Sequence, residues 1–163
     1  MTSQGSHVGE TRGTVHAAGL RVGVLVARFN ADITERLLDG ALRCLSEHGA
    51  SETDVDVYRV PGAWELPQAA ARIAALGRHD ALVALGCVIR GETPHFGFVC
   101  DQANLGLGEV ARSSRAPLVF GVLTTENHPQ ALARAGDGPS NKGYEVTLAA
   151  LQMIDLYRSL GDA

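Results

Sequence analysis

One short stretch of this sequence combines a titratable side chain with the start of a predicted helix. Thr93 is a good N-cap and Pro94 suits the first helical position, which puts His95 in the first helical turn. The free N–H groups and the positive dipole end of a helix start attract an anion and disfavour a charged imidazolium. We therefore predict that a neutral His95 lies beside a bound phosphate. An ordinary surface histidine in an α/β crossover is the alternative.

Three aromatic rings belong to, or follow, runs of residues with the pattern of strands. Phe29 directly follows an apolar run, Trp64 stands in a turn made rigid by two prolines and a glycine, and Phe120 belongs to a later apolar run. Such rings either pack under loops or offer a stacking face to a heteroaromatic ligand. Glu65 can bind hydroxyl groups, although a glutamate in a first helical turn is often only a partner of the helix dipole.

Two basic side chains in the last third of the chain are candidates for binding an anion. Arg134 precedes a loop rich in glycine and proline, and its guanidinium has the fork geometry that suits phosphate. Lys142 begins the last predicted helix, one turn before Glu145. The alternatives are a solvated arginine and a helical surface pair, the latter worth about 0.2–0.5 kcal/mol.

These residues need a domain to position them, and the apolar periodicity predicts one of the α/β class. Strand patterns alternate with helix patterns along the chain, which implies right-handed βαβ units and a parallel sheet covered by helices on both faces. We predict a three-layer α/β/α sandwich with a central four-stranded parallel sheet, in which ligands bind beyond the carboxyl ends of the strands. The predicted strands are 20–27, 55–60, 81–89 and 118–123, and the predicted helices are 32–48, 66–76, 95–115 and 141–160, with a short helical stretch at 130–136.

The bulk properties limit the class of partner. The chain has 163 residues, enough for one domain, and a net charge of −4 with dispersed basic residues, which argues against nucleic-acid binding. Three cysteines show no C-x-x-C spacing, so neither a disulfide framework nor a metal site is expected. No apolar run approaches the length of a membrane span. We expect residues 1–19 to form a flexible arm, residues 20–163 to form the domain, and the protein to be cytoplasmic.

Five separated blocks, in this order, resemble the 6,7-dimethyl-8-ribityllumazine synthase family. The resemblance runs from about Leu20 to the carboxyl terminus, and it implies a flavodoxin-like fold. Members of this family are transferases of riboflavin biosynthesis. They join 5-amino-6-(D-ribitylamino)uracil to 3,4-dihydroxy-2-butanone 4-phosphate and release phosphate and water, without a metal or an organic cofactor. The blocks are Arg28-Phe29-Asn30, 60–67, 86–96, 120–124 and Asn141-Lys142-Gly143.

The resemblance also implies roles for single residues. His95 matches the catalytic acid/base, and Phe120 matches an aromatic residue supplied by a neighbouring subunit. Glu92 puts a carboxylate into the phosphate loop, so we expect its backbone N–H to face the anion and its side chain to turn away. The other implied residues are Phe29, Ala63, Trp64, Glu65, Cys87, Val88 and Ile89 for the pyrimidine substrate, Glu92, Thr93 and Arg134 for phosphate, and Asn30 and Lys142 in support.

Alternatives to this function, and the size of the assembly, stay open at this point. A non-catalytic flavin- or lumazine-binding module on the same fold would keep Phe29 and Trp64 but would not need both His95 and Arg134. A plain structural or shell protein explains self-association but not the polar residues. The resemblance implies a homopentamer. The loop 136–140 leaves a pentamer, a decamer and a sixty-subunit icosahedral shell open.

Overall fold

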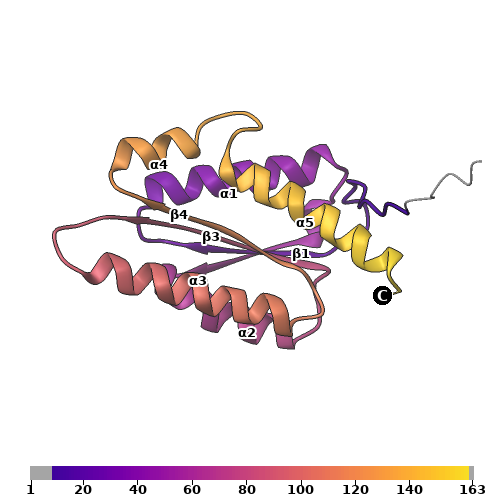
Figure 1. Cartoon of the computed structure of the whole chain (residues 1–163). Coiled ribbons are helices and arrows are strands. Elements are labelled where there is room, and N and C mark those ends of the chain that lie inside the picture. The colour runs from indigo at the N-terminus through magenta and orange to yellow at the C-terminus, as the bar shows by residue number, and fades with distance from the viewer. Residues whose placement is uncertain (1–8, 162–163) are drawn as a thin grey trace, which may run out of the picture.

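The predicted sandwich is confirmed by the computed structural model, which describes residues 9–161. Four parallel strands lie in the order β2-β1-β3-β4. Helices α1, α4 and α5 cover one face of the sheet and helices α2 and α3 cover the other (Figure 1). The elements are β1 (Val22–Ala27), α1 (Ala31–Glu47), β2 (Val55–Val60), α2 (Leu66–Ala75), β3 (Ala81–Ile89), α3 (His95–Ser113), β4 (Leu118–Thr125), α4 (His128–Arg134) and α5 (Lys142–Ser159), with short 3₁₀ turns η1 (Glu52–Asp54) and η2 (Ala63–Glu65).

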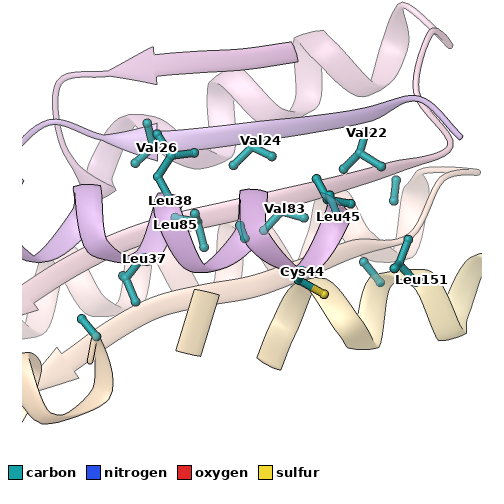
Figure 2. Packing of buried hydrophobic residues seen from close by; sticks show 14 of the residues in the cluster. Val22, Val24, Val26, Leu37, Leu38, Cys44, Leu45, Val83, Leu85 and Leu151 are labelled. Carbon is teal, nitrogen blue, oxygen red and sulfur yellow. The ribbon is translucent and has the colours of Figure 1, made fainter. Parts of the chain in front are cut away.

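Aliphatic side chains hold the layers together on both faces of the sheet. Each residue of β1 is buried, as expected for a strand covered on two sides. Figure 2 shows one of the two clusters, in which side chains of β1 and β3 pack against those of α1 and α5. The second cluster joins the opposite face to α2 and α3. The strands are therefore a rigid platform for whatever lies at their ends.

The carboxyl ends of the two central strands are staggered. The pairing of β1 with β3 reaches Val26 and Leu85, and β1 ends at Ala27. In contrast, β3 continues beside β4 as far as the pair Ile89 and Thr125. The last residues of β3 therefore have a neighbouring strand on the β4 side and none on the β1 side.

Helices α1 and α5 approach so closely that glycine is required at their crossing. A Cβ atom added to Gly143 would lie 1.9 Å from the backbone oxygen of Leu37. Beside it, Asn141 caps α5 by accepting from the N–H of Tyr144, and its Nδ2 donates to the carbonyl oxygens of Arg36 and Gly136. The start of α5 and the loop before it are thus fixed to α1.

Some details differ from the sequence-based expectations. Thr93 is not the N-cap of α3, because Pro94 itself has a helical ψ of −8° and occupies the cap, and the first turn closes through Gly97 N–H and Pro94 C=O at 3.0 Å. Strand β4 runs two residues further than predicted, and the short helical stretch forms α4 two residues earlier. Residues 1–8 of the predicted arm lie outside the described residues. Its later part packs on the domain, where Ala17 is fully buried.

Neither a membrane span nor a metal cluster is found in residues 9–161. None of the helices described there has the length and apolar character that crossing a bilayer requires. Across the same residues, no three His, Cys, Asp or Glu side chains are grouped so that they could hold a metal ion.

Candidate active site

A cavity of about 500 Å³ opens at the carboxyl ends of β1 and β3, beside the start of α3. This is the edge of a parallel sheet at which ligands are expected. Carbon atoms make up most of its walls, and a few polar groups interrupt them, as is typical of sites for small organic ligands. It is lined by Phe29, Pro61, Gly62, Ala63, Trp64, Glu65, Cys87, Val88, Ile89, Gly91, Thr93, His95, Phe96 and Val99.

The end of β1 supplies an exposed aromatic ring on a fixed turn. Phe29 is 72% exposed, which is unusual for phenylalanine, and its N–H donates to Pro61 C=O at 3.0 Å. Asn30 follows with φ 59° and ψ 49°, the only left-handed residue other than glycine among those described. Its Nδ2 donates to Cys87 C=O at 2.9 Å. The ring therefore stands on a turn tied to both β2 and β3.

The turn after β2 brings a second ring and a carboxylate to the same cavity. The carboxylate of Glu65 accepts from the N–H of Gly62 at 2.9 Å, which closes the turn on itself. Leu66, the next residue, is fully buried and anchors the turn in the core. Trp64 consequently stays half-exposed at the cavity wall.

The staggered end of β3 leaves backbone hydrogen-bonding groups of the strand facing the cavity. The N–H of Leu82 and the N–H of Arg90 donate to residues in or beside β4. The even-numbered residues of β3 therefore direct their backbone N–H and C=O groups toward β4. Alternation along a strand then turns the N–H and C=O of Cys87 and Ile89 the other way. The carbonyl of Cys87 already accepts from Asn30. Ile89, which lies beyond the end of β1, is left with a donor and an acceptor at an open strand edge.

His95 is exposed at the mouth of this cavity, in the first turn of α3. The segment before it bends at Glu92 and Thr93 and turns at Pro94, and Gly91 and Thr93 line the cavity together with His95. A histidine here can exchange protons with a ligand lying over the end of β3. The N-terminal N–H groups of α3 remain available to an anion.

Two side-chain contacts at this edge of the sheet were not predicted from the sequence. Arg90 forms a two-point ion pair with Glu126, and its guanidinium carbon lies 4.3 Å from the centroid of the Phe96 ring. His128 bonds to Asp32, and this bond lowers the pKa of the Asp32 carboxyl. Each partner directly follows a strand or begins a helix, a signal available in the sequence, but their pairing depends on the sheet order.

The thiol at the floor of the cavity is not poised to be a nucleophile. Burial raises the pKa of Cys87 to about 11, with a smaller contribution from the charge of Asp32. A thiol with this pKa is overwhelmingly protonated at neutral pH, whereas the thiolate is the reactive form. Cys87 therefore contributes shape and a backbone carbonyl to the site.

Comparisons with known proteins match nearly the whole chain. The family model described as 6,7-dimethyl-8-ribityllumazine synthase matches residues 19–158. The chain belongs to this family. The chain is 43% identical to the 6,7-dimethyl-8-ribityllumazine synthase of Chlorobium chlorochromatii (strain CaD3) over 154 residues, which cover 94% of this chain and 99% of that protein. The synthase of Desulfatibacillum aliphaticivorans is 46% identical over 144 residues, 88% of this chain and 93% of that protein.

Most residues that the lumazine synthase resemblance implied lie together in this chain. Nine of the fourteen line the cavity, and they come from four separate segments. Their individual roles stay predictions. The nine are Phe29, Ala63, Trp64, Glu65, Cys87, Val88, Ile89, Thr93 and His95.

Five implied residues lie outside the lining of the cavity. Asn30 supports it through Cys87, and the exposed Glu92 adjoins it in sequence. Phe120 lies five residues before the end of β4, about 16 Å back along the strand. Arg134 ends α4 and donates to Gln130 C=O at 2.9 Å, and Lys142 pairs with Glu145 at 2.8 Å. The cavity of one chain is therefore lined by only some of the residues that the resemblance implies.

Proposed function

We propose that this chain catalyses the condensation of 5-amino-6-(D-ribitylamino)uracil with 3,4-dihydroxy-2-butanone 4-phosphate. The products are 6,7-dimethyl-8-ribityllumazine, phosphate and water. One observation carries the proposal: a single cavity combines the open strand edge at Ile89, the exposed ring of Phe29 and the exposed His95. Membership of the lumazine synthase family supports it independently.

The pyrimidine substrate fits the open edge of β3. A uracil ring presents an N–H and a C=O side by side, and Ile89 offers the complementary acceptor and donor in its main chain. The ring of Phe29 can stack on the face of a pyrimidine held there. Glu65 already accepts from Gly62, and a carboxylate can accept further bonds from the hydroxyl groups of a ribityl chain. Ala63 and Trp64 complete this wall.

The phosphate-bearing substrate fits the turn before α3. Its phosphate would lie at the N–H groups of Thr93 and of the first turn, which brings its ketone close to His95. The amine of the uracil then attacks the ketone and water leaves as the imine forms. Removal of the proton from the neighbouring hydroxyl-bearing carbon then expels phosphate and leaves an enol, which tautomerises to a new carbonyl. The ribitylamino nitrogen closes onto this carbonyl with loss of a second water. At each stage His95 takes a proton from one atom and returns it to another.

Orientation of the two substrates supplies more of the rate than proton transfer. Correct placement can lower a barrier by about 7–11 kcal/mol, whereas one acid/base group usually contributes about 10²–10⁴-fold. His95→Ala should therefore be impaired and not dead. His128→Ala is the matched control, because His128 also begins a helix at this edge but lies outside the cavity. Full activity of His95→Ala would refute the assigned role.

The deciding experiment mixes the purified chain with both substrates. Lumazine fluorescence and inorganic phosphate should rise together, with a one-to-one ratio. A non-catalytic lumazine-binding module would bind the product without releasing phosphate, and a plain shell protein would do neither. The names of the relatives favour the enzyme over both alternatives.

A second copy of the chain would complete the site. Phe120 is 40% exposed, Arg134 is exposed, and both lie outside the cavity of their own chain. We expect each cavity to face these residues of a neighbour, with the homopentamer as the smallest assembly. Mixing His95→Ala and Arg134→Ala chains during refolding should restore roughly a quarter of the sites. Recovery no better than the mean of the two variants would place Arg134 in its own chain's site.

Arg134 should act mainly on the phosphate-bearing substrate. Arg134→Ala is expected to raise the KM for that substrate while the KM for the pyrimidine is kept, because a guanidinium binds phosphate through two parallel hydrogen bonds. An unchanged KM would contradict this assignment. Sedimentation of the same samples separates a pentamer from a decamer or a larger shell. A cytoplasmic location is proposed as well, and cell fractionation tests it.

A further inference from the structure

Arg90 is the first residue after β3, and its backbone prolongs the sheet by one hydrogen bond. Its N–H donates to Thr125 C=O at 2.9 Å, which continues the pairing of β3 with β4. Five residues later the chain reaches His95. The base of the turn that carries His95 is thus fixed, and the position of its far end depends on other contacts.

The side chain of Arg90 reaches both Glu126, the residue that follows β4, and helix α3. Its Nε donates to Oε2 of Glu126 at 2.6 Å, and its Nη2 donates to Oε1 at 3.2 Å. The same guanidinium lies over the ring of Phe96, with its central carbon 4.3 Å from the ring centroid. A planar guanidinium can satisfy a carboxylate with its edge and an aromatic ring with its face at once, and a lysine ammonium cannot.

This contact links the helical turn that carries His95 to the residue that follows β4. Phe96 directly follows His95, so its ring and the imidazole are carried by the same helical turn. Among residues 9–161, no side-chain hydrogen bond or ion pair holds residues 91–95. Arg90 therefore limits how far the first turn of α3 can move relative to the strand edge at Ile89.

The ion pair is exposed to solvent, so it contributes little to the stability of the fold although it can still position a catalytic side chain. The side chains of Arg90 and Glu126 are 50% and 57% exposed, and pairs in contact with solvent contribute about 0–1 kcal/mol to folding. Catalysis is far more sensitive to geometry, because a displacement of about 1 Å can cost about 100-fold in rate. A contact that matters little for the fold can thus matter greatly for proton transfer.

We propose that Arg90 is a positioning residue that orients His95 by joining Glu126 to Phe96. This inference rests on the proposed role of His95 and adds a residue that touches neither substrate. Arg90→Lys keeps the charge but loses the fork and the planar face. It should lower kcat by about 10-fold while the KM of both substrates stays within about twofold. The melting temperature should change by less than about 2 °C.

The test is a comparison of Arg90→Lys in two backgrounds. In the wild-type chain kcat should fall about 10-fold, and in the His95→Ala chain the same substitution should change kcat by less than about twofold, because the group it orients is gone. Glu126→Gln, introduced into the otherwise wild-type chain, should lower kcat by the same factor as Arg90→Lys. Arg59→Lys is the matched control, since Arg59 of β2 forms a similar two-point pair with Glu35 of α1, and neither residue lines the cavity.

The experiments distinguish failure of the proposed reaction, of the role of His95 and of the role of Arg90. An inactive wild-type chain would refute the proposed reaction, and an active His95→Ala chain at full rate would refute the role of His95. Equal losses from Arg90→Lys in both backgrounds would show that Arg90 acts independently of His95 and would overturn the positioning proposal. A change confined to KM, or a rate above half that of wild type, would overturn it as well.

Discussion

Asn30 combines an unusual backbone conformation with a hydrogen bond that crosses the sheet edge, so its removal should have a large and divisible effect. Its backbone is left-handed, its C=O accepts from the N–H groups of Ile33 and Thr34 in α1, and its side-chain amide donates to Cys87 C=O at 2.9 Å. Asn30→Ala keeps the backbone contacts to the helix but deletes the side-chain amide. Alanine also lacks the polar side chain that helps asparagine to tolerate a left-handed backbone.

Two contributions set the expected loss of stability. An unpaired, partly buried carbonyl at Cys87 costs about 1–3 kcal/mol. Left-handed geometry costs an ordinary residue about 1–2 kcal/mol, of which asparagine already carries a part. We therefore expect Asn30→Ala to lower the free energy of unfolding by about 2–4 kcal/mol, or the melting temperature by about 4–16 °C. Asn30→Gly deletes the same amide without the backbone cost and should lose about 1 kcal/mol less.

Urea unfolding at fixed protein concentration, followed by circular dichroism, measures the free energy of unfolding of the wild-type, Asn30→Ala and Asn30→Gly proteins. The KM for the pyrimidine substrate should rise in both variants, because Phe29 stands on the same turn. Equal stability of the alanine and glycine variants would refute the backbone contribution. A loss below about 0.5 kcal/mol in Asn30→Ala would refute the whole argument, since even an ordinary hydrogen bond contributes about that much.

The remaining predictions concern packing, ligand binding and the thiols. Gly143→Ala should lower stability by more than about 3 kcal/mol in a urea titration, because backbone of α1 occupies the place of its Cβ, whereas Gly91→Ala, with open space around it, should not. Trp64 is the only tryptophan and lines the cavity, so the pyrimidine substrate should alter the intrinsic fluorescence of the wild-type chain, and unchanged emission at saturation would remove Trp64 from the site. Burial raises the pKa of Cys44 to about 12 and of Cys87 to about 11 from an ordinary 9.0. The stability that these protonated thiols contribute is therefore complete below about pH 9 and is lost as the pH rises through 11 for Cys87 and through 12 for Cys44. A Cys44→Ala/Cys87→Ala chain should show a shallower fall of the urea midpoint between pH 9 and 11, and parallel curves would contradict this.

The order of elements follows from the sequence because each strand and helix carries its own periodic pattern. The run 81–89 is apolar at nearly every position, and the structure confirms it as β3 with the predicted bounds. The N-cap at Thr93 was wrong, since a capping preference is local while the start of α3 depends on how Pro94 closes the first turn. Strand β4 was predicted too short, because Thr124 and Thr125 look polar until β3 provides their partners.

The candidate site, too, was predictable only in part. Residues in the segments between a strand and the next helix, such as Phe29 and His95, were identified because parallel strands end at one edge of the sheet. The stagger that exposes Ile89 was not predictable, as it depends on the register between β1 and β3. Nor was the contact between Arg90 and Glu126, which requires that β3 and β4 be neighbours. Residues 36 positions apart carry no sign of pairing in a single sequence.

The stagger between β1 and β3 also determines how deep the cavity can be. Beyond the last paired residues, β3 continues for three residues past the level of Ala27, and three residues of strand span about 10 Å. The hollow therefore owes its depth to the length of one strand, and the side chains around it only tune its width and polarity. Such a hollow survives changes of lining residues, which leaves them free to diverge toward other flat ligands. Lengthening β1 by two residues would fill it outright.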